Sequence, residues 1–368
     1  MAKNSEERAA LPLNGARVLP SVQVDSYNLE LKDEEGFIGD RARKGAFWEI
    51  VDDIRKTLKD VDDDPLGDIP TEEIGKEKLA VLLAKGSPEQ AGVVQTAIDE
   101  FAHELAFVIR KFMRLKDWRD TECIVIGGGF SGSLIGRLAV GRAAVLLKSD
   151  GMVVDLQLIR SHPNEAGLLG AAHLLPAWML EGYDAMLAVD IGGTNIRAGL
   201  IELNLKRSPD LAASKVAKFE LWRHADEEID RASAVSRLAG MIKKLIEWAE
   251  KNGLRLAPVI GIGCPGVIEE DGSIARGAQN LPGNWESSRF NLVDSLRDEI
   301  PTIGKHEAVV VMHNDAVVQG LSELPRVQDR LHWAVLTIGT GLGNARYTNR
   351  RPEKPKPGKT KHAKEKAK

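Results

Sequence analysis

The amino-acid sequence predicts an α/β fold with two domains, and three observations carry this prediction. The chain has 368 residues, 43% of them hydrophobic, which is long enough for two separate cores. Short apolar runs, such as 123–126, 186–189 and 334–338, each end at a glycine-rich turn and are typical of buried strands. Between them lie stretches whose apolar residues recur at three- and four-residue spacing, which indicates amphipathic helices.

The charge of the chain is unevenly distributed. Residues 350–368 hold nine Lys or Arg and two Glu, whereas the rest of the chain holds 41 basic and 52 acidic residues. An acidic body argues against a nucleic-acid-binding core, and two cysteines provide neither a disulfide framework nor a zinc site. Residues 1–20 lack the apolar region of a signal peptide, and the longest near-apolar run, 166–180, is too short to span a bilayer. We therefore expect a cytoplasmic protein without a membrane segment.

The secondary structure of the N-terminal part of the chain is predicted from the periodicity of its apolar residues. Residues 1–36 are polar and show no clear period, so we expect a flexible arm there. Residues 45–58 and 72–84 have helical spacing and predict two helices. A longer helix is expected from Ser87, a serine cap followed by proline and by a glutamine that can close a capping box, to about residue 112.

The first glycine turn follows the apolar run 123–126. Gly127, Gly128 and Gly129 lead from this predicted strand into a predicted helix at 134–147. A glycine turn between strand and helix is a common way for an α/β protein to approach a nucleotide. The spacing differs from the dinucleotide-binding fingerprint, so a turn that merely connects strand and helix is the other interpretation. A further strand at 153–159 and a helix opening in 164–174 complete this block.

The stretch 186–202 predicts a β-hairpin with a phosphate-binding turn. An apolar run ends at Asp190, Gly192 and Gly193 make a tight turn, and a second apolar run begins beyond Thr194. Glycines let backbone N–H groups approach phosphate oxygens closely, and the threonine adds a hydroxyl group. Asp190 can hold a magnesium ion through water. The alternative is an ordinary hairpin whose glycines serve only the turn.

An asparagine–aspartate pair follows the predicted strand 308–312. A carboxylate at Asp315 can take the proton of an attacking hydroxyl group while Asn314 orients the hydroxyl. Such a pair is also a common helix N-cap, which is the alternative interpretation. A second glycine hairpin follows at 334–343, with Gly339, Thr340 and Gly341 at its turn.

Together these motifs resemble the ROK family of bacterial sugar kinases and sugar-responsive repressors, within the hexokinase–actin superfamily. The resemblance covers roughly residues 85–345 and includes an Asn-Leu-Pro-Gly stretch that begins at Asn280. It implies two RNase H-like domains, the actin-like ATPase fold, with a nucleotide cleft between them. It also implies ATP and Mg²⁺ as cofactors and a small-molecule sugar as substrate.

The resemblance implies a role for each motif residue. The sugar would contact Asn280, Asn314 and Asp315, with Asp315 as the catalytic base, and Asp190 would hold the magnesium ion through water. The ATP phosphates would be bound by Gly192, Gly193, Thr194, Gly339, Thr340 and Gly341, and the adenosine would lie against Gly127, Gly128 and Gly129.

The order of these blocks departs from the family. Residues 90–175 resemble the C-terminal portion of ROK kinases, yet they precede the N-terminal-type hairpin. Because no motif is duplicated, we predict a circular permutation rather than a truncated first copy followed by a truncated second. The predicted organisation is a flexible arm (1–36), a C-terminal-type lobe on the adenosine side (37–175), an N-terminal-type lobe (176–300), a segment with the catalytic aspartate and second hairpin (301–347), and a disordered basic tail (348–368).

Part of the family pattern is missing. The Gly-Glu-x-Gly-His segment and the cysteine-rich zinc loop, which supply a glutamate and a histidine to the sugar, do not occur, so no zinc is expected. Asn284 is inserted before the tryptophan of the Asn-Leu-Pro-Gly stretch. Only the first 85 residues could fill the space of the missing segment.

The leading functional prediction is ATP-dependent phosphorylation of a sugar hydroxyl. The alternative is a non-catalytic sugar- or nucleotide-binding sensor of the same fold. The basic tail could be an arm for nucleic acid or an acidic partner, or only a solubilising tail. The chain could also pair with a second copy as a homodimer.

Overall fold

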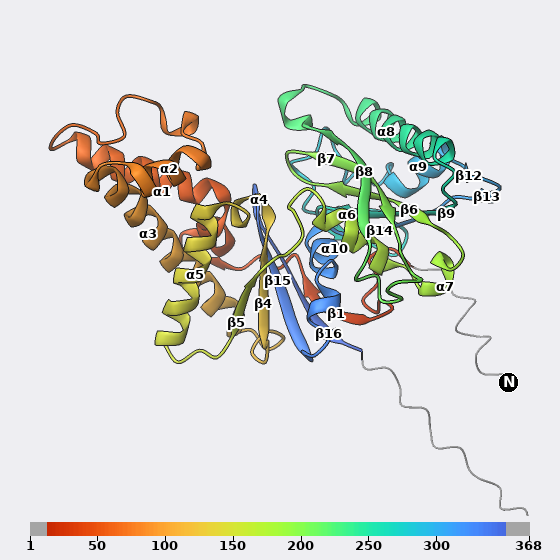
Figure 1. Cartoon of the computed structure of the whole chain (residues 1–368), viewed down its shortest axis with the longest axis horizontal. Coiled ribbons are helices and arrows are strands. Elements are labelled where there is room, and N and C mark those ends of the chain that lie inside the picture. The colour runs from red at the N-terminus through yellow and green to blue at the C-terminus, as the bar shows by residue number, and fades with distance from the viewer. Residues whose placement is uncertain (1–12, 351–368) are drawn as a thin grey trace, which may run out of the picture.

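Two five-stranded sheets form the framework of the molecule (Figure 1). The structure is a computed structural model, and it describes residues 13–350. Helices cover the outer face of each sheet, and two further helices lie between the sheets. Within residues 13–350, no helix has the length and apolar character needed to cross a membrane.

The first sheet carries helices α1, α2, α3 and α5 on the side away from the second sheet (Figure 1). Its strand order is β1-β16-β15-β4-β5; β1, β16 and β15 run antiparallel, whereas β15, β4 and β5 run parallel. The strands are β1 (Val22–Tyr27), β4 (Cys123–Gly127), β5 (Asp155–Leu158), β15 (His332–Ile338) and β16 (Leu342–Asn349). The helices are α1 (Lys44–Lys59), α2 (Lys76–Lys85), α3 (Pro88–Met113), α4 (Gly128–Ser131) and α5 (Leu134–Ser149).

The second sheet has the strand order β14-β9-β6-β7-β8. Here β6, β7 and β8 run antiparallel, whereas β6, β9 and β14 run parallel. The strands are β6 (Ala185–Ile191), β7 (Ile196–Glu202), β8 (Lys215–Trp222), β9 (Leu256–Cys264) and β14 (Val309–Asn314), and the covering helices are α8 (Arg231–Lys251) and α9 (Leu292–Glu299). Short two-stranded ribbons pair β2 (Lys32–Asp33) with β3 (Gly36–Phe37), β10 (Val267–Ile268) with β11 (Ile274–Arg276), and β12 (Thr302–Ile303) with β13 (His306–Glu307).

The two sheets have the same arrangement of strand positions and directions. Read from the antiparallel edge, the strands at these positions of the second sheet are β8-β7-β6-β9-β14. The equivalent positions of the first sheet are β1-β16-β15-β4-β5, so its central antiparallel hairpin comes last in the sequence. The chain therefore enters the first sheet at an edge strand and completes that sheet only at its C-terminal end.

Helices α6 (Ala166–Ala171) and α10 (Asp315–Leu321) pack against each other between the two sheets (Figure 1). A core cluster draws buried residues from both sheets and from both helices, including Val125, Leu168, Met186, Val317 and Val335. The helices approach closely because Gly170 faces α10: a Cβ atom built there would overlap the carbonyl oxygen of Val318. This packing joins the two halves of the molecule.

We expect Gly170→Ala to destabilise the protein by about 1–3 kcal/mol, the usual range for overpacking, because the added methyl group must push α6 away from α10. The matched control is Gly141→Ala in α5, where a Cβ atom would meet no neighbour within 4 Å. That control should be more stable than the wild type by up to about 1 kcal/mol, because alanine has a higher helix propensity than glycine. Urea unfolding of both variants measures the two values, and equal stability of both would contradict the close packing.

The structure corrects the expected flexible arm at residues 1–36. Residues 22–27 form the edge strand β1, paired with β16, and Leu19, Val22 and Val24 are buried. Valines at alternating positions fit a strand that covers one face of a sheet, a period of two that a search for helical spacing passes over. Residues 1–12 of the predicted arm and residues 351–368 of the predicted basic tail lie outside the described range.

The local expectations for the helices and hairpins are confirmed. Ser87 caps α3 with a complete capping box, in which its hydroxyl accepts from the backbone N–H of Gln90 and the Gln90 side chain accepts from the backbone N–H of Ser87. The predicted hairpins are β6–β7 and β15–β16. The segment predicted as one unit at 301–347 is divided, since β14 belongs to the second sheet and β15 to the first.

Candidate functional site

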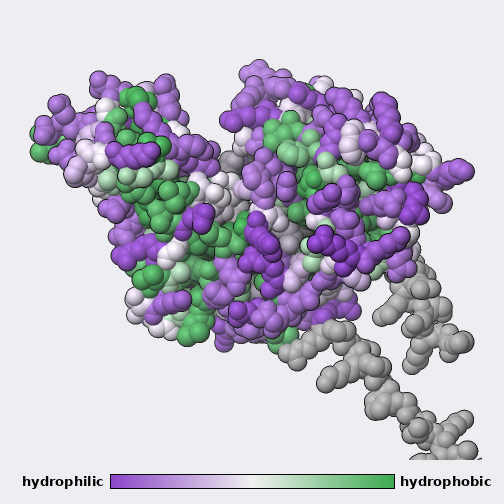
Figure 2. Space-filling view, viewed as in Figure 1, coloured by the Kyte–Doolittle hydropathy of each residue, from purple (hydrophilic) through white to green (hydrophobic). Residues whose placement is uncertain are grey.

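A cavity of about 750 Å³ lies between the two halves of the molecule, and its volume is in the range of ligand sites. Figure 2 shows the surface hollowed between the part that carries α1–α3 and the part that carries α8. Residues of both sheets and of the N-terminal segment line this cavity. The predicted site residues that line it are Gly128, Gly129, Asp190, Gly192, Gly193, Thr194, Asn280, Asp315, Gly339, Thr340 and Gly341.

The hairpin β6–β7 provides one wall of the cavity. All seven residues of β6 are buried, so the strand is anchored on both faces up to its glycine turn. Asp190 and Arg197 are direct neighbours across the hairpin, and their side chains form an ion pair at 3.0 Å. Burial raises the pKa of the Asp190 carboxyl, whereas Arg197 lowers it. Arg197 also donates to the side-chain oxygen of Asn164.

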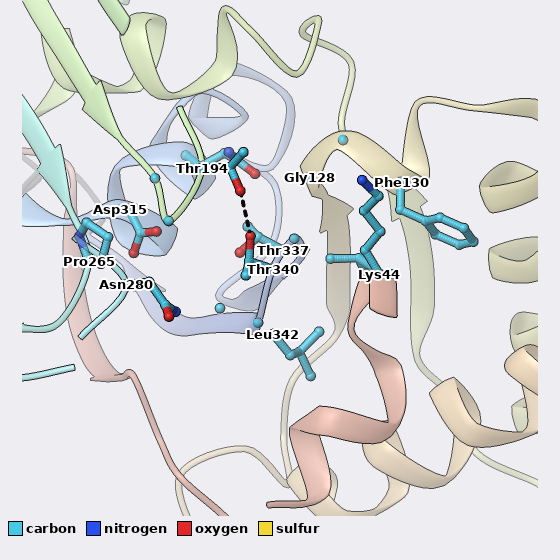
Figure 3. A pocket seen from close by; sticks show the side chains of 18 of the residues that line it. Lys44, Gly128, Phe130, Thr194, Pro265, Asn280, Asp315, Thr337, Thr340 and Leu342 are labelled. Carbon is cyan, nitrogen blue, oxygen red and sulfur yellow. Dashed lines mark hydrogen bonds between the residues drawn. The ribbon is translucent and has the colours of Figure 1, made fainter. Parts of the chain in front are cut away.

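The turn of the second hairpin, β15–β16, meets the turn of the first. The hydroxyl groups of Thr194 and Thr340 are 3.0 Å apart and hydrogen-bonded, which Figure 3 shows as a dashed line. A Cβ atom built on Gly193 would lie 3.3 Å from the Cβ of Asn280 and 3.7 Å from that of Thr340. The two predicted phosphate turns and the predicted sugar loop therefore converge at one point.

Asp315 is the first residue of α10 and faces the cavity from the side of the second sheet (Figure 3). Burial and, secondly, the nearby Asp190 carboxylate raise the pKa of its carboxyl to about 7, against the hydrogen bonds around it. A carboxyl with a pKa near neutrality is well matched to accepting a proton at physiological pH. Parallel strands β9 and β14 end together here, and Asp315 follows the end of β14.

The structure does not bring Asn314 into the cavity. Asn314 is the N-cap of α10: its side-chain oxygen accepts from the N–H groups of Ala316 and Val317, and its amide donates to the carbonyl of Gly266. It is 1% exposed. The expectation that Asn314 contacts the sugar is therefore corrected, because capping the helix occupies its polar atoms. Asn314 instead positions Asp315.

Two of the three glycines in the predicted adenosine turn line the cavity. Gly128 has a φ of 88°, and a Cβ atom there would overlap the carbonyl oxygen of Ile338, so only glycine fits at this position. Gly129 is open to the cavity. Gly127 does not line it: this residue ends β4 beneath Gln319, whose side-chain oxygen would lie 2.7 Å from a Cβ atom. The expected contact of Gly127 with adenosine is therefore corrected.

The cavity residues that were not predicted from the sequence include Asn28, Lys44, Lys76 and Arg197. The first three come from the N-terminal segment, which carries no motif and reaches the site only through the tertiary fold. Asn28 has a φ of 50° and a buried side-chain amide nitrogen without a hydrogen-bond partner. The sequence signal for Arg197 was its position seven residues after Asp190, across a predicted hairpin.

The acidic residues of the cavity fit a magnesium–nucleotide complex. Within residues 13–350 no cluster of three or more His, Cys, Asp or Glu side chains could hold a metal ion by itself. Mg²⁺ in phosphate sites uses one or two carboxylates, water and the phosphates themselves. Asp190 and Asp315 both line the cavity, and Asp190 raises the pKa of Asp315, so a cation at this place would relieve their repulsion.

The fold and the cavity define a class of mixed α/β protein in which glycine hairpins from two sheets meet at one site. Residues 186–362 match the model of the ROK family. Over this part, just under half of its length, the chain is similar to the ROK family.

Two known proteins illustrate the relationship. The glucokinase of Thermotoga maritima is 30% identical over 166 residues, which are 45% of this chain and 44% of the glucokinase. The crystal structure of the ROK hexokinase from Thermus thermophilus aligns at 22% identity and a TM-score of 0.33, over 46% of this chain and 49% of the hexokinase. The chain thus spans about half the length of the relatives that it matches.

Proposed function

We propose that this protein transfers the terminal phosphoryl group of ATP to a hydroxyl group of a sugar. The observation that carries the proposal is the meeting of the two glycine hairpins, at Thr194 and Thr340, in the cavity that Asp315 and Asn280 also line. The match of residues 186–362 to the model of the ROK family and the name of the similar glucokinase agree with it.

Each part of the cavity then has a separate task. The backbone N–H groups and hydroxyls of the two turns hold the phosphates, while the adenosine lies against Gly128 and Gly129. Asp315 accepts the proton of the sugar hydroxyl as the hydroxyl oxygen bonds to the γ-phosphorus and ADP leaves. Asn280, packed against the first turn, orients the sugar. Asp190 would hold Mg²⁺ through water, and the ion would neutralise charge on the phosphates.

We further infer that the fold consists of two RNase H-like domains of the actin-like ATPase type in permuted order. The identical strand positions and directions of the two sheets support this inference. One domain would combine β1, β4 and β5 with β15 and β16, and the other would run from β6 to β14. These boundaries replace the sequence-based division at residues 37–175, 176–300 and 301–347.

A nucleotide-binding experiment tests the proposal. Calorimetry with a non-hydrolysable ATP analogue and Mg²⁺ should detect binding to the wild type. Thr340→Val should weaken it by about tenfold or more, because it removes a hydrogen bond to a charged phosphate. Thr96→Val, on the exposed surface of α3, is the matched control and should leave the affinity unchanged. Undetectable binding to the wild type at millimolar nucleotide would refute the proposal.

A second candidate function is a sugar sensor without kinase activity. Two observations favour it: the family segment that supplies a glutamate and a histidine to the sugar is missing from this sequence, and Asn314 is buried as a helix cap and does not line the cavity. A panel of sugars assayed with ATP distinguishes the two functions. Binding of a sugar without any phosphorylation would support the sensor, whereas turnover would exclude it.

A further inference from the structure

Two lysines from the N-terminal segment line the cavity, although no sequence motif includes them. Lys44 is the first residue of α1, and Lys76 is the first residue of α2. Figure 3 shows the Lys44 side chain beside Gly128 and Phe130, on the opposite side of the second hairpin from Asp315. Lys44 therefore lies on the adenosine side of the cavity, away from the proposed sugar, and Lys76 lies on the same side because it contacts Gly129.

Hydrogen bonds tie the two lysines to the two glycine turns on this side. The backbone N–H of Lys44 donates to the carbonyl of Gly339 at 3.0 Å. The Nζ of Lys76 donates to the carbonyl of Gly129 at 2.7 Å. A nucleotide whose adenosine lies at Gly129 and whose terminal phosphates lie at Gly339 would extend from the contact of one lysine to the contact of the other.

The charges of the two lysines are not balanced by ion pairs. Within the described part of the chain, the lysines that form ion pairs are Lys59, Lys215 and Lys243. Burial lowers the pKa of Lys76, the positive charge of Lys44 lowers it further, and the neighbouring Glu77 partly offsets this. Bringing two cations together in a partly desolvated place costs free energy, and an anion between them would recover it.

We propose that Lys44 and Lys76 form an anion clamp that binds the phosphate chain of the nucleotide between the Gly128–Gly129 turn and the Gly339–Gly341 turn. This inference rests on the proposed function and assigns a role to residues outside the family match. Lysine suits the task because its ammonium group is a compact charge with three donors on a flexible stem. The N-terminal segment thereby completes a site that the two hairpins build only in part.

The test compares nucleotide and nucleoside binding in Lys44→Gln, Lys76→Gln and the double variant. Affinity for the ATP analogue should fall about tenfold for each lysine, because each removes a charged hydrogen bond to phosphate. Affinity for adenosine should stay the same, since glutamine at position 76 can still donate to the Gly129 carbonyl. Lys56→Gln in α1 and Lys78→Gln in α2 are matched controls on the exposed faces of the same helices.

Each other outcome overturns the clamp. If the double variant binds the ATP analogue as tightly as the wild type, the lysines do not contact phosphate, and the proposed function stands without them. If adenosine and the ATP analogue lose affinity equally, the lysines only support the glycine turn. If the wild type binds no nucleotide, both the clamp and the proposed function fail.

Discussion

Asp315→Asn should abolish nearly all phosphoryl transfer while leaving the fold intact. Asparagine keeps the size of the side chain but cannot accept the proton of the sugar hydroxyl, so turnover should fall by about 10²–10⁴-fold, the usual contribution of general base catalysis. Binding of the ATP analogue should persist, because the phosphate turns are unchanged. Stability should not decrease: Asn314 is the cap of α10, and the replacement removes a carboxylate whose pKa is raised by burial.

The pH dependence of the wild type gives a second measurement of the same group. The Asp315 carboxyl has a pKa of about 7 in the folded protein, so the base is protonated in acid and ionised above neutrality. The ratio kcat/KM should rise with pH up to about 7 and then level off. The same raised pKa means that ionisation of Asp315 lowers the stability of the fold as the pH rises from about 4 to about 7.

The control for Asp315 is Asp294→Asn, an exposed aspartate in the first turn of α9. This variant should keep full turnover and the same pH profile as the wild type. If Asp315→Asn phosphorylates a sugar as fast as the wild type, the base assignment is wrong. A wild-type profile that does not change between pH 5 and 8 would contradict the assignment as well.

Arg197→Met should destabilise the protein by about 3–5 kcal/mol, because it leaves the Asp190 charge buried without a partner. Asp190 is only 5% exposed, and Arg197 is the cation that holds it, at 3.0 Å. The double variant Asp190→Asn, Arg197→Met removes both charges and should recover most of this loss. Urea unfolding of the two single variants, the double variant and the wild type measures the coupling.

The loss of stability caused by Arg197→Met should depend on pH. The folded-state pKa of Asp190 lies above its usual value, chiefly through burial, and Arg197 opposes the shift. Without Arg197 this pKa should rise further, so ionised Asp190 would destabilise the variant above that pKa and its protonation in acid would relieve the loss. The destabilisation should therefore be largest at neutral and alkaline pH and should shrink in acid.

A second cross-strand pair of the same sheet serves as the control. Lys215 and Glu202 are direct neighbours on β8 and β7 at 2.9 Å, but the lysine side chain is 64% exposed. Lys215→Met should therefore change stability by no more than about 1 kcal/mol, as is usual for exposed ion pairs. Equal losses of stability in Arg197→Met and Lys215→Met would show that the burial of Asp190 is not the cause of the destabilisation.

Several features of the fold could be predicted from the sequence because they depend on neighbouring residues. The capping box at Ser87 and the helical spacing that follows it involve residues within a few turns of one another. The two hairpins were predicted because apolar runs and glycine turns determine strand and turn locally. The pairing of Asp190 with Arg197 follows from the register of one such hairpin.

The assembly of the site depended on the tertiary structure. Thr194 and Thr340 are 146 residues apart, and only the packing of two sheets around α6 and α10 brings their hydroxyls to 3.0 Å. The same packing places residues 22–27, which were expected to belong to a flexible arm, in the edge strand β1. It also places Asn28, Lys44 and Lys76 at the cavity. It also gives Asn314 and Asp315 different surroundings, since Asn314 is buried as the cap of α10, whereas Asp315 lines the cavity. Local pattern determines secondary structure and turn chemistry, whereas long-range burial decides which of those turns meet.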